Sequence, residues 1–248
     1  MKQILKIVSI IFLICFSFFY TNQAIKWSRL GDPIMKQVME EGLHNFINPI
    51  SIGKISATEV RVGSVGYKID INKSYEAMKQ VGTYQDNLLV YKEVKPANSI
   101  NDNLNKYVVL GNSRKQGVTL VFRSDNIADL KVINGIIKEK GIMVTFINRN
   151  DLFFSNAEVY KLYNPDFCYT IRTNRSLLND CAKNNKITVK PIQIRNSLYK
   201  NIKNKVVVGS IFEIEVNQNN VNELPLVINY LKNKGYKLLP LSEHIRED

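Results

Sequence analysis

Apolar and polar positions in the second half of the chain alternate between two spacings. Short apolar runs at 118–122 and 142–147 predict strands. The apolar residues between them recur on one face of a predicted helix that Gly141 ends: Ile127, Leu130, Ile133, Ile136 and Ile137. Further strands are predicted at 167–171, 187–194 and 206–216, with short helices at 176–183 and 196–203. Such alternation predicts parallel strands with right-handed crossovers, in an open sheet or an incomplete barrel.

The stretch 224–245 continues this pattern to the end of the chain. Asn222 is suited to cap a helix, and Gly235 is suited to end it in the left-handed conformation. The apolar positions of this helix share one face: Leu224, Val227, Ile228 and Leu231. Residues 236–241 then form an apolar run, which predicts one more strand.

The amino end has a different character. Lys2 and Lys6 precede an apolar run at 7–20, and polar residues follow it. This pattern predicts a signal sequence or a signal anchor over residues 1–25. Since no small-residue cleavage site follows, we favour an uncleaved, single-pass membrane anchor. The basic amino end then lies in the cytoplasm and the bulk of the chain is extracytoplasmic.

The rest of the chain divides into further segments. Residues 32–95 mix short helical and extended patterns and predict a small α/β unit beside the membrane, either a spacer or a wall-binding module. Residues 96–105 are expected to be a linker, and residues 106–248 the larger α/β domain. Cys168 and Cys181 fall in a predicted strand and a predicted helix. We expect two buried thiols, although export permits a disulfide.

The net charge of the chain limits the classes of binding partner that we expect. The 248 residues carry a formal net charge of +12, which favours polyanionic surroundings. Zinc-finger spacings, a basic helix and interleaved aromatic and basic residues are missing from the sequence, so nucleic acid is not an expected partner. For an exported chain, we attribute the positive charge chiefly to solubility beside an anionic wall or membrane.

Gly209-Ser210-Ile211 and the 224–245 stretch together resemble the end of the polysaccharide deacetylase family, also called the NodB homology domain. The resemblance covers roughly the second half of the chain and implies an incomplete (β/α) barrel. Segments 120–122 and 144–146 then correspond to its first two strands.

The resemblance also implies a chemistry. In that family an Asp and two His residues of a His-x-x-x-His pair hold zinc or a similar ion. A second Asp takes a proton from the metal-bound water, which attacks an N-acetyl carbon. These groups sit at the carboxyl ends of the strands, together with an Arg-Pro-Pro-Tyr loop and a Leu-His pair.

This sequence departs from the family at each of these positions. Arg123 stands where the base is expected, Ser124 where the metal-binding carboxylate is expected, and Asp125 comes one residue late. Ser124 or Asp125 is suited to cap the next helix. Thr170 and Asn174 fall at the histidine positions, and neither is a useful zinc ligand.

The remaining family positions are also altered. Lys190-Pro191-Ile192-Gln193 is the remnant of the Arg-Pro-Pro loop, and Glu215 replaces the last histidine. We expect both histidines of the chain, His44 and His244, to lie at the surface. The residues at the degenerate ligand positions therefore predict no metal and no other cofactor.

Strand alternation places Glu213 and Glu215 on one face of the strand at 206–216. A charge in a strand-end pocket must be paired, so we hypothesise that Arg123 pairs with Glu215 or Glu213 and fills the former metal site. The alternative is an edge strand whose glutamates face solvent.

The sequence as a whole predicts a membrane-anchored, extracytoplasmic, deacetylase-like pseudoenzyme. It would bind a cell-wall polysaccharide or an envelope protein, with Arg123, Glu213 and Glu215 as glycan-binding candidates. One alternative is an active carbohydrate hydrolase or deacetylase that uses Asp125, Glu213 and Glu215 as paired carboxylates. Another is a structural docking partner in an envelope complex.

Overall fold

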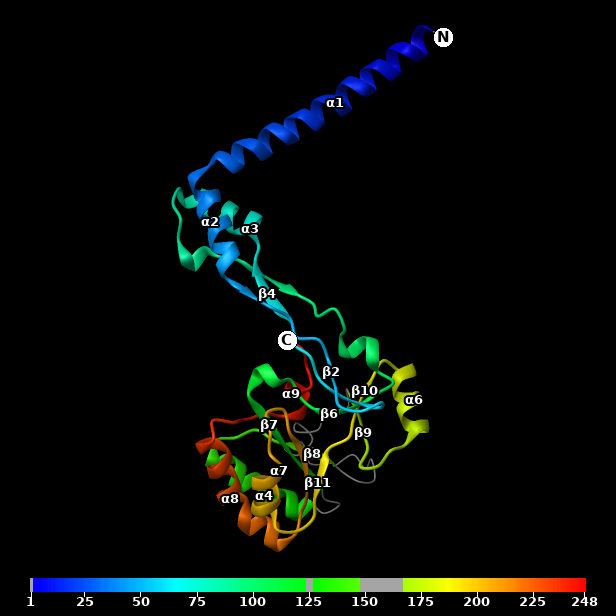
Figure 1. Cartoon of the computed structure of the whole chain (residues 1–248), viewed down its shortest axis with the longest axis vertical. Helices are drawn as coiled ribbons and strands as arrows, with labels where there is room; N and C mark the ends of the chain where they lie inside the picture. The colour runs from blue at the N-terminus through cyan, green and yellow to red at the C-terminus, as the bar shows by residue number, and fades with distance from the viewer. Residues whose placement is uncertain (1, 124–126, 148–166) are drawn as a thin grey trace. The chain divides into compact units, whose positions relative to one another are not determined.

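The computed structural model describes residues 2–123, 127–147 and 167–248 (Figure 1). The chain divides into two compact units, the first made of residues 1–48 and 66–94 and the second of residues 49–65 and 95–248. The first unit therefore differs from the segment expected at 32–95. Residues 49–65 leave it because their strands pair with a strand of the second unit.

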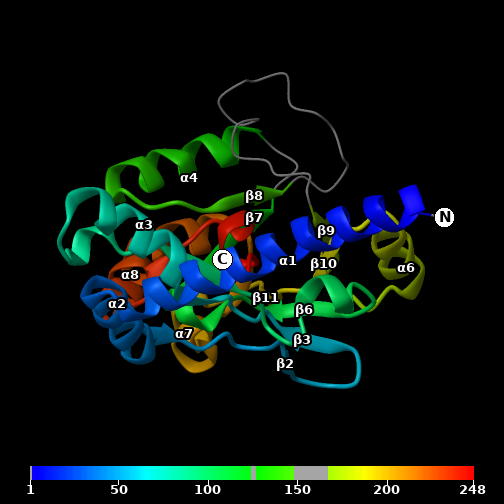
Figure 2. The same cartoon turned by 90° about the horizontal axis from the view of Figure 1, so that it is seen from above.

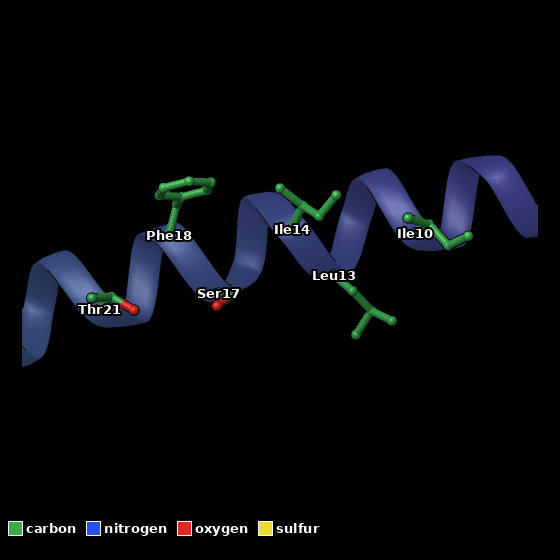
Figure 3. A pocket seen from close by; sticks show the side chains of 6 residues that line it. All are labelled: Ile10, Leu13, Ile14, Ser17, Phe18 and Thr21. Atoms are coloured by element: carbon green, nitrogen blue, oxygen red, sulfur yellow. The ribbon is translucent and has the colours of Figure 1, made fainter.

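The first unit begins with the long helix α1 (Lys2–Gly31). Its part from Ile10 to Gly31 is long and apolar enough to cross a membrane. At about 1.5 Å per residue these 22 residues span about 33 Å, close to the ~30 Å hydrocarbon core of a bilayer. Figure 3 shows side chains of Ile10, Leu13, Ile14 and Phe18 projecting from this helix, and all four are exposed.

The rest of the first unit is a small α/β layer. Helices α2 (Pro33–His44) and α3 (Ile71–Val81) pack on the antiparallel sheet β1-β4-β5, which consists of β1 (Phe46–Ile47), β4 (Gly66–Ile69) and β5 (Tyr91–Val94). A short 3₁₀ helix η1 (Asp86–Leu88) precedes β5. Val38, Ile69 and Met78 form the buried core. Asp32 caps α2 by accepting a hydrogen bond from the Ile34 amide.

The second unit contains two mainly parallel sheets. The first has the order β2 (Gly53–Lys54), β3 (Glu59–Arg61), β6 (Tyr107–Leu110), β10 (Ile187–Val189) and β9 (Phe167–Tyr169). The second has the order β11 (Ile192–Ile194), β12 (Ile211–Glu215), β7 (Gly117–Arg123) and β13 (Lys237–Leu238), with β8 (Thr145–Ile147) also paired to β7. The prediction of one strand at 187–194 was wrong. Pro191, which has no amide hydrogen, lies between β10 and β11, and these belong to different sheets.

The helices of the second unit mostly follow the predicted pattern. They are α4 (Ile127–Lys140), α6 (Arg175–Lys183), α7 (Leu198–Lys205), α8 (Gln218–Asn233) and α9 (Leu241–His244), with the 3₁₀ helices η2 (Ile100–Asn103) and η3 (Ser113–Lys115). Helix α8 begins earlier than predicted, because Asn217 rather than Asn222 caps it. The segment expected to be a linker at 96–105 is folded instead, since η2 buries Ile100 in a core of this unit.

Strand β7 separates two cores because its side chains alternate. Val118, Leu120 and Phe122 belong to a core that also contains buried residues of α4, α7 and α8, and these three helices lie near one another in Figure 1. Val121 faces the other way and joins a core that includes residues of both sheets, among them Val60, Val108, Val189 and Ile211. The space between the sheets is therefore a packed interior.

The carboxyl-terminal segment closes one end of this interior, and it corrects one prediction. His244 is fully buried instead of lying at the surface, whereas His44 is exposed as expected. Its ring fits because Gly111 and Gly117 have no side chain: a Cβ at Gly111 would lie 2.6 Å from His244 Cδ2. The contacting residues are distant in sequence, so local pattern gave no sign of this burial.

Helix α6 lies beside β9 and β10 (Figure 2) and is joined to β9 by a disulfide. Cys168 and Cys181 form this bond, with their Cα atoms 6.2 Å apart. The expectation of two free buried thiols was therefore wrong. The helix follows its strand closely enough to bring the two cysteines within bonding range.

Candidate functional site

The candidate site lies where β7 ends. Arg123 is the last residue of β7, and Glu213 lies on the neighbouring strand β12, opposite Val121. Arg123 Nε donates to Glu213 Oε1 at 3.0 Å. The side chains are only 15% and 2% exposed, so this ion pair is largely shielded from water. The hypothesised pairing is confirmed, with Glu213 as the partner.

Two further side chains complete the shell of Glu213. Tyr169, at the end of β9, donates its hydroxyl to Glu213 Oε2 at 2.6 Å, and Gln193 of β11 donates its amide to Glu213 Oε1 at 3.2 Å. One carboxylate thus accepts hydrogen bonds from three side chains on three other strands. A buried ion pair is stable only when its remaining hydrogen-bonding groups are also satisfied, and here both carboxylate oxygens of Glu213 have partners. We call these four residues the Glu213 cluster.

The environment of the cluster also acts on Tyr169. Burial raises the pKa of its phenol well above the usual value of 10.0, and the nearby charge of Glu213 raises it further. Tyr169 therefore stays protonated and remains a hydrogen-bond donor to the carboxylate throughout the physiological range.

The two glutamates of β12 differ in their exposure to solvent. The idea that both face solvent is wrong for Glu213, which is buried, and right for Glu215, which is exposed at the end of the strand. Glu215 stands directly opposite Arg123 in the strand register, yet Arg123 bonds to Glu213.

Thr170 and Asn174, which stand at the family's histidine positions, form hydrogen bonds with nearby backbone groups. The Thr170 hydroxyl donates to the Arg172 carbonyl at 2.6 Å and accepts from the Arg172 amide at 3.3 Å. Asn174 caps α6 by accepting from the Leu177 amide at 3.1 Å. These side chains form a turn and a helix cap.

Ser124 and Asp125 lie outside the described residues, so their capping role stays a prediction. Within the described ranges, no group of three or more His, Cys, Asp or Glu side chains is arranged to hold a metal ion. The donor set at the strand ends does not fit a hydrolytic metal either. A guanidinium occupies the base position, and Glu213, the buried carboxylate among the described residues, already accepts from three donors.

The sequence pattern found only half of the cluster. Tyr169 and Gln193 were not singled out, although Gln193 belongs to the remnant loop and Tyr169 directly precedes Thr170. The order of the strands brings them to Glu213, and that order is not visible in a linear pattern.

Comparison with solved structures identifies the fold. The structure of the wild-type protein BA3943 from Bacillus anthracis, described as a CE4 family pseudoenzyme, is similar at a TM-score of 0.59 and 16% identity. The match covers 87% of this chain and 96% of that one. The chain has a polysaccharide-deacetylase-like fold. A mutant of the same pseudoenzyme, described as having restored enzymatic activity, matches at a TM-score of 0.58 and 16% identity, over 87% of this chain and 99% of that one.

This deacetylase-like fold was expected from the resemblance of the carboxyl-terminal stretch, and that expectation is confirmed. No protein-family model matches the sequence, and no curated protein does. At 16% identity the structural likeness establishes the fold, and the function must be argued from the side chains.

Proposed function

We propose that the protein is a membrane-anchored, extracytoplasmic pseudoenzyme that binds a cell-envelope glycan without hydrolysing it. One observation carries the non-hydrolytic part. Glu213, the buried carboxylate beside Arg123 among the described residues, accepts hydrogen bonds from Arg123, Tyr169 and Gln193. A carboxylate held in this way is not available as a metal ligand or a general base.

The membrane part of the proposal is supported by α1. Its apolar side chains are exposed from Ile10 onward, and Trp27 is 73% exposed near the end of the helix. Burial of these side chains in lipid would remove a large apolar surface from water. An aromatic residue near the end of a spanning segment suits the membrane interface.

The glycan part is supported by the distribution of charge. The second unit holds 25 Lys and Arg against 15 Asp and Glu, a surplus of +10 out of the total of +12. The deacetylase-like unit thus carries most of the charge that would attract an anionic envelope polymer. Of the three glycan-binding candidates, Glu215 is the exposed one, because Arg123 and Glu213 are occupied by each other.

The alternative of an active carbohydrate hydrolase gains no support from this geometry. It needs two free carboxylates among Asp125, Glu213 and Glu215, and Glu213 is engaged by three donors. Asp125 lies outside the described residues.

The proposal is tested by co-sedimentation of the purified full-length protein, kept in detergent, with insoluble peptidoglycan. We expect the protein to sediment with the glycan and to release no acetate from it. Acetate release with turnover would overturn the non-hydrolytic part. Absence of co-sedimentation, combined with capture of a defined membrane protein from envelope extracts, would favour the docking-partner alternative.

A further inference from the structure

The outer surface of the second unit carries a groove between α7 and α8, away from the Glu213 cluster. It has a volume of about 280 Å³, and its lining combines aromatic, amide and basic side chains: Tyr199, Leu226, Asn229, Tyr230, Asn233 and Lys234. No acidic residue is part of this lining.

The two tyrosines are held in fixed positions. Their ring centroids lie 5.7 Å apart with the planes at 80°, an edge-to-face arrangement. The Tyr199 amide donates to Glu223 Oε2 at 2.7 Å, which fixes the start of α7 to α8 and also engages the Glu223 carboxylate. Both tyrosines are half-buried, so the groove is largely preformed.

The rest of the lining is exposed and capable of hydrogen bonding. Asn229 and Asn233 lie one helical turn apart on α8, and both are exposed. Leu226, two turns before Asn233, is 53% exposed. Aromatic faces beside amides suit a pyranose ring, which has apolar C–H faces and a rim of hydroxyl groups.

Basic side chains add a preference for negative charge. Lys234 lines the groove, and Lys203 Nζ lies 5.9 Å from the centroid of the Tyr199 ring. The volume is just below the ~300–1,000 Å³ of typical ligand clefts, so the groove suits a short segment of a chain. A helical peptide partner would need a continuous apolar stripe, and Leu226 is the aliphatic residue in this lining.

We propose that this groove binds a short stretch of an anionic polysaccharide, one whose sugars carry carboxylate groups. The inference rests on the proposed glycan-binding function, for which it names the contact surface and the ligand class. The tyrosine rings contact the sugar faces, the two asparagines bind hydroxyl or acetamido groups, and Lys203 and Lys234 bind the carboxylates.

The test is isothermal titration calorimetry of the full-length protein in detergent with two probes. A hyaluronan hexasaccharide carries carboxylates, and chitohexaose is a neutral oligosaccharide of the same length. We expect the hyaluronan probe to bind at least tenfold more tightly than chitohexaose, and its affinity to fall as salt rises. Tyr199→Ala and Tyr230→Ala should each weaken binding at least tenfold.

Matched controls separate the groove from the fold. Tyr91→Ala removes an exposed tyrosine of the first unit and should leave binding unchanged. Lys205→Ala, on α7 but outside the lining, should change affinity less than Lys234→Ala. Asn229→Ala and Asn233→Ala truncate exposed side chains, so they test the groove even where a tyrosine variant fails to fold.

The outcomes distinguish this inference from the proposed function. Full hyaluronan binding by the folded groove variants would refute the groove and leave the glycan-binding proposal standing. Equal affinity for the two probes would refute the anionic class. If the wild-type protein sediments with peptidoglycan but binds neither oligosaccharide, the groove inference fails alone. If it does neither, both proposals fail.

Discussion

The hydrogen bonds of Glu213 limit the chemistry that is available at the carboxyl ends of the strands. Its carboxylate is 2% exposed and is bonded to a guanidinium, a phenol and an amide. Removing one partner of such a pair leaves a buried charge without compensation, which costs about 3–5 kcal/mol, whereas replacing both partners with apolar groups costs much less. The cluster therefore stabilises the fold at the end of β7, where the family resemblance predicts the former metal site.

This arrangement predicts strong coupling between Arg123 and Glu213. Glu213→Ala should lower the free energy of unfolding by about 3–5 kcal/mol, and the double variant Arg123→Leu/Glu213→Leu by clearly less. Denaturant unfolding of the full-length protein in detergent, followed by circular dichroism, measures both. Glu215→Ala is the matched control and should have an effect within about 0.5 kcal/mol, because Glu215 is exposed. Additive effects of the two cluster positions would contradict the ion pair.

At the scale of single elements, the disulfide between β9 and α6 is a second source of stability. Cys168 and Cys181 are separated by 13 positions, and closing a loop of this size is worth about 3 kcal/mol. Cys168→Ser/Cys181→Ser should therefore destabilise the protein by about that amount in denaturant unfolding. Cys15→Ser removes the exposed free cysteine of α1 and serves as the control. Equal stability of wild type and double variant would show that the bond does not form.

Helix α9 carries a second testable feature, the buried His244. The Thr119 hydroxyl donates to the Leu239 carbonyl at 2.9 Å and contacts His244 Nδ1 at 2.8 Å, so Nδ1 is the nitrogen that donates. Within the described part of the chain, His244 Nε2 has no hydrogen-bond partner. Burial, assisted by the charge of Lys115, lowers the pKa of His244 from 6.5 to about 4.

Because folding favours the neutral ring, its stabilising contribution is complete above pH 6.5 and is lost as the pH falls toward 4. The loss between pH 6.5 and pH 5 should be about 2 kcal/mol. Thermal unfolding of the full-length protein at several pH values measures it. His44→Asn, at an exposed position, should keep this acid sensitivity, and His244→Asn should reduce it. A wild-type melting temperature that is constant from pH 7 to pH 5 would contradict the prediction.

Features that depend on the local pattern of apolar and polar residues could be predicted from the sequence. The alternation in β12 correctly placed Phe212 and Ile214 on the helix-facing side and Glu213 on the other. The break at Pro191, the burial of His244 and the cysteine pairing depend on which strands become neighbours. The small size of Gly111 and Gly117, which admits His244, acts across more than a hundred residues.

At the scale of the whole molecule, the proposed membrane location depends on α1. We expect the full-length protein to stay with the membrane after carbonate extraction, because the exposed apolar surface from Ile10 to Gly31 is long enough to span a bilayer. Replacing Ile14 and Phe18 with Arg should release it into the soluble fraction, since charges at the centre of a span are costly. Replacement of Lys26 with Arg keeps the charge, so this control should stay in the membrane fraction. Release of the wild-type protein by carbonate would contradict the anchor.

The central claim is that the Glu213 cluster occupies the place of a hydrolytic metal. The most direct test is the metal content of the full-length protein after equilibration with zinc and removal of the excess, measured by atomic emission. The account predicts far less than one zinc per chain, because the strand-end carboxylate is already bonded to Arg123, Tyr169 and Gln193. One zinc retained per chain, and lost in Glu213→Ala, would contradict it.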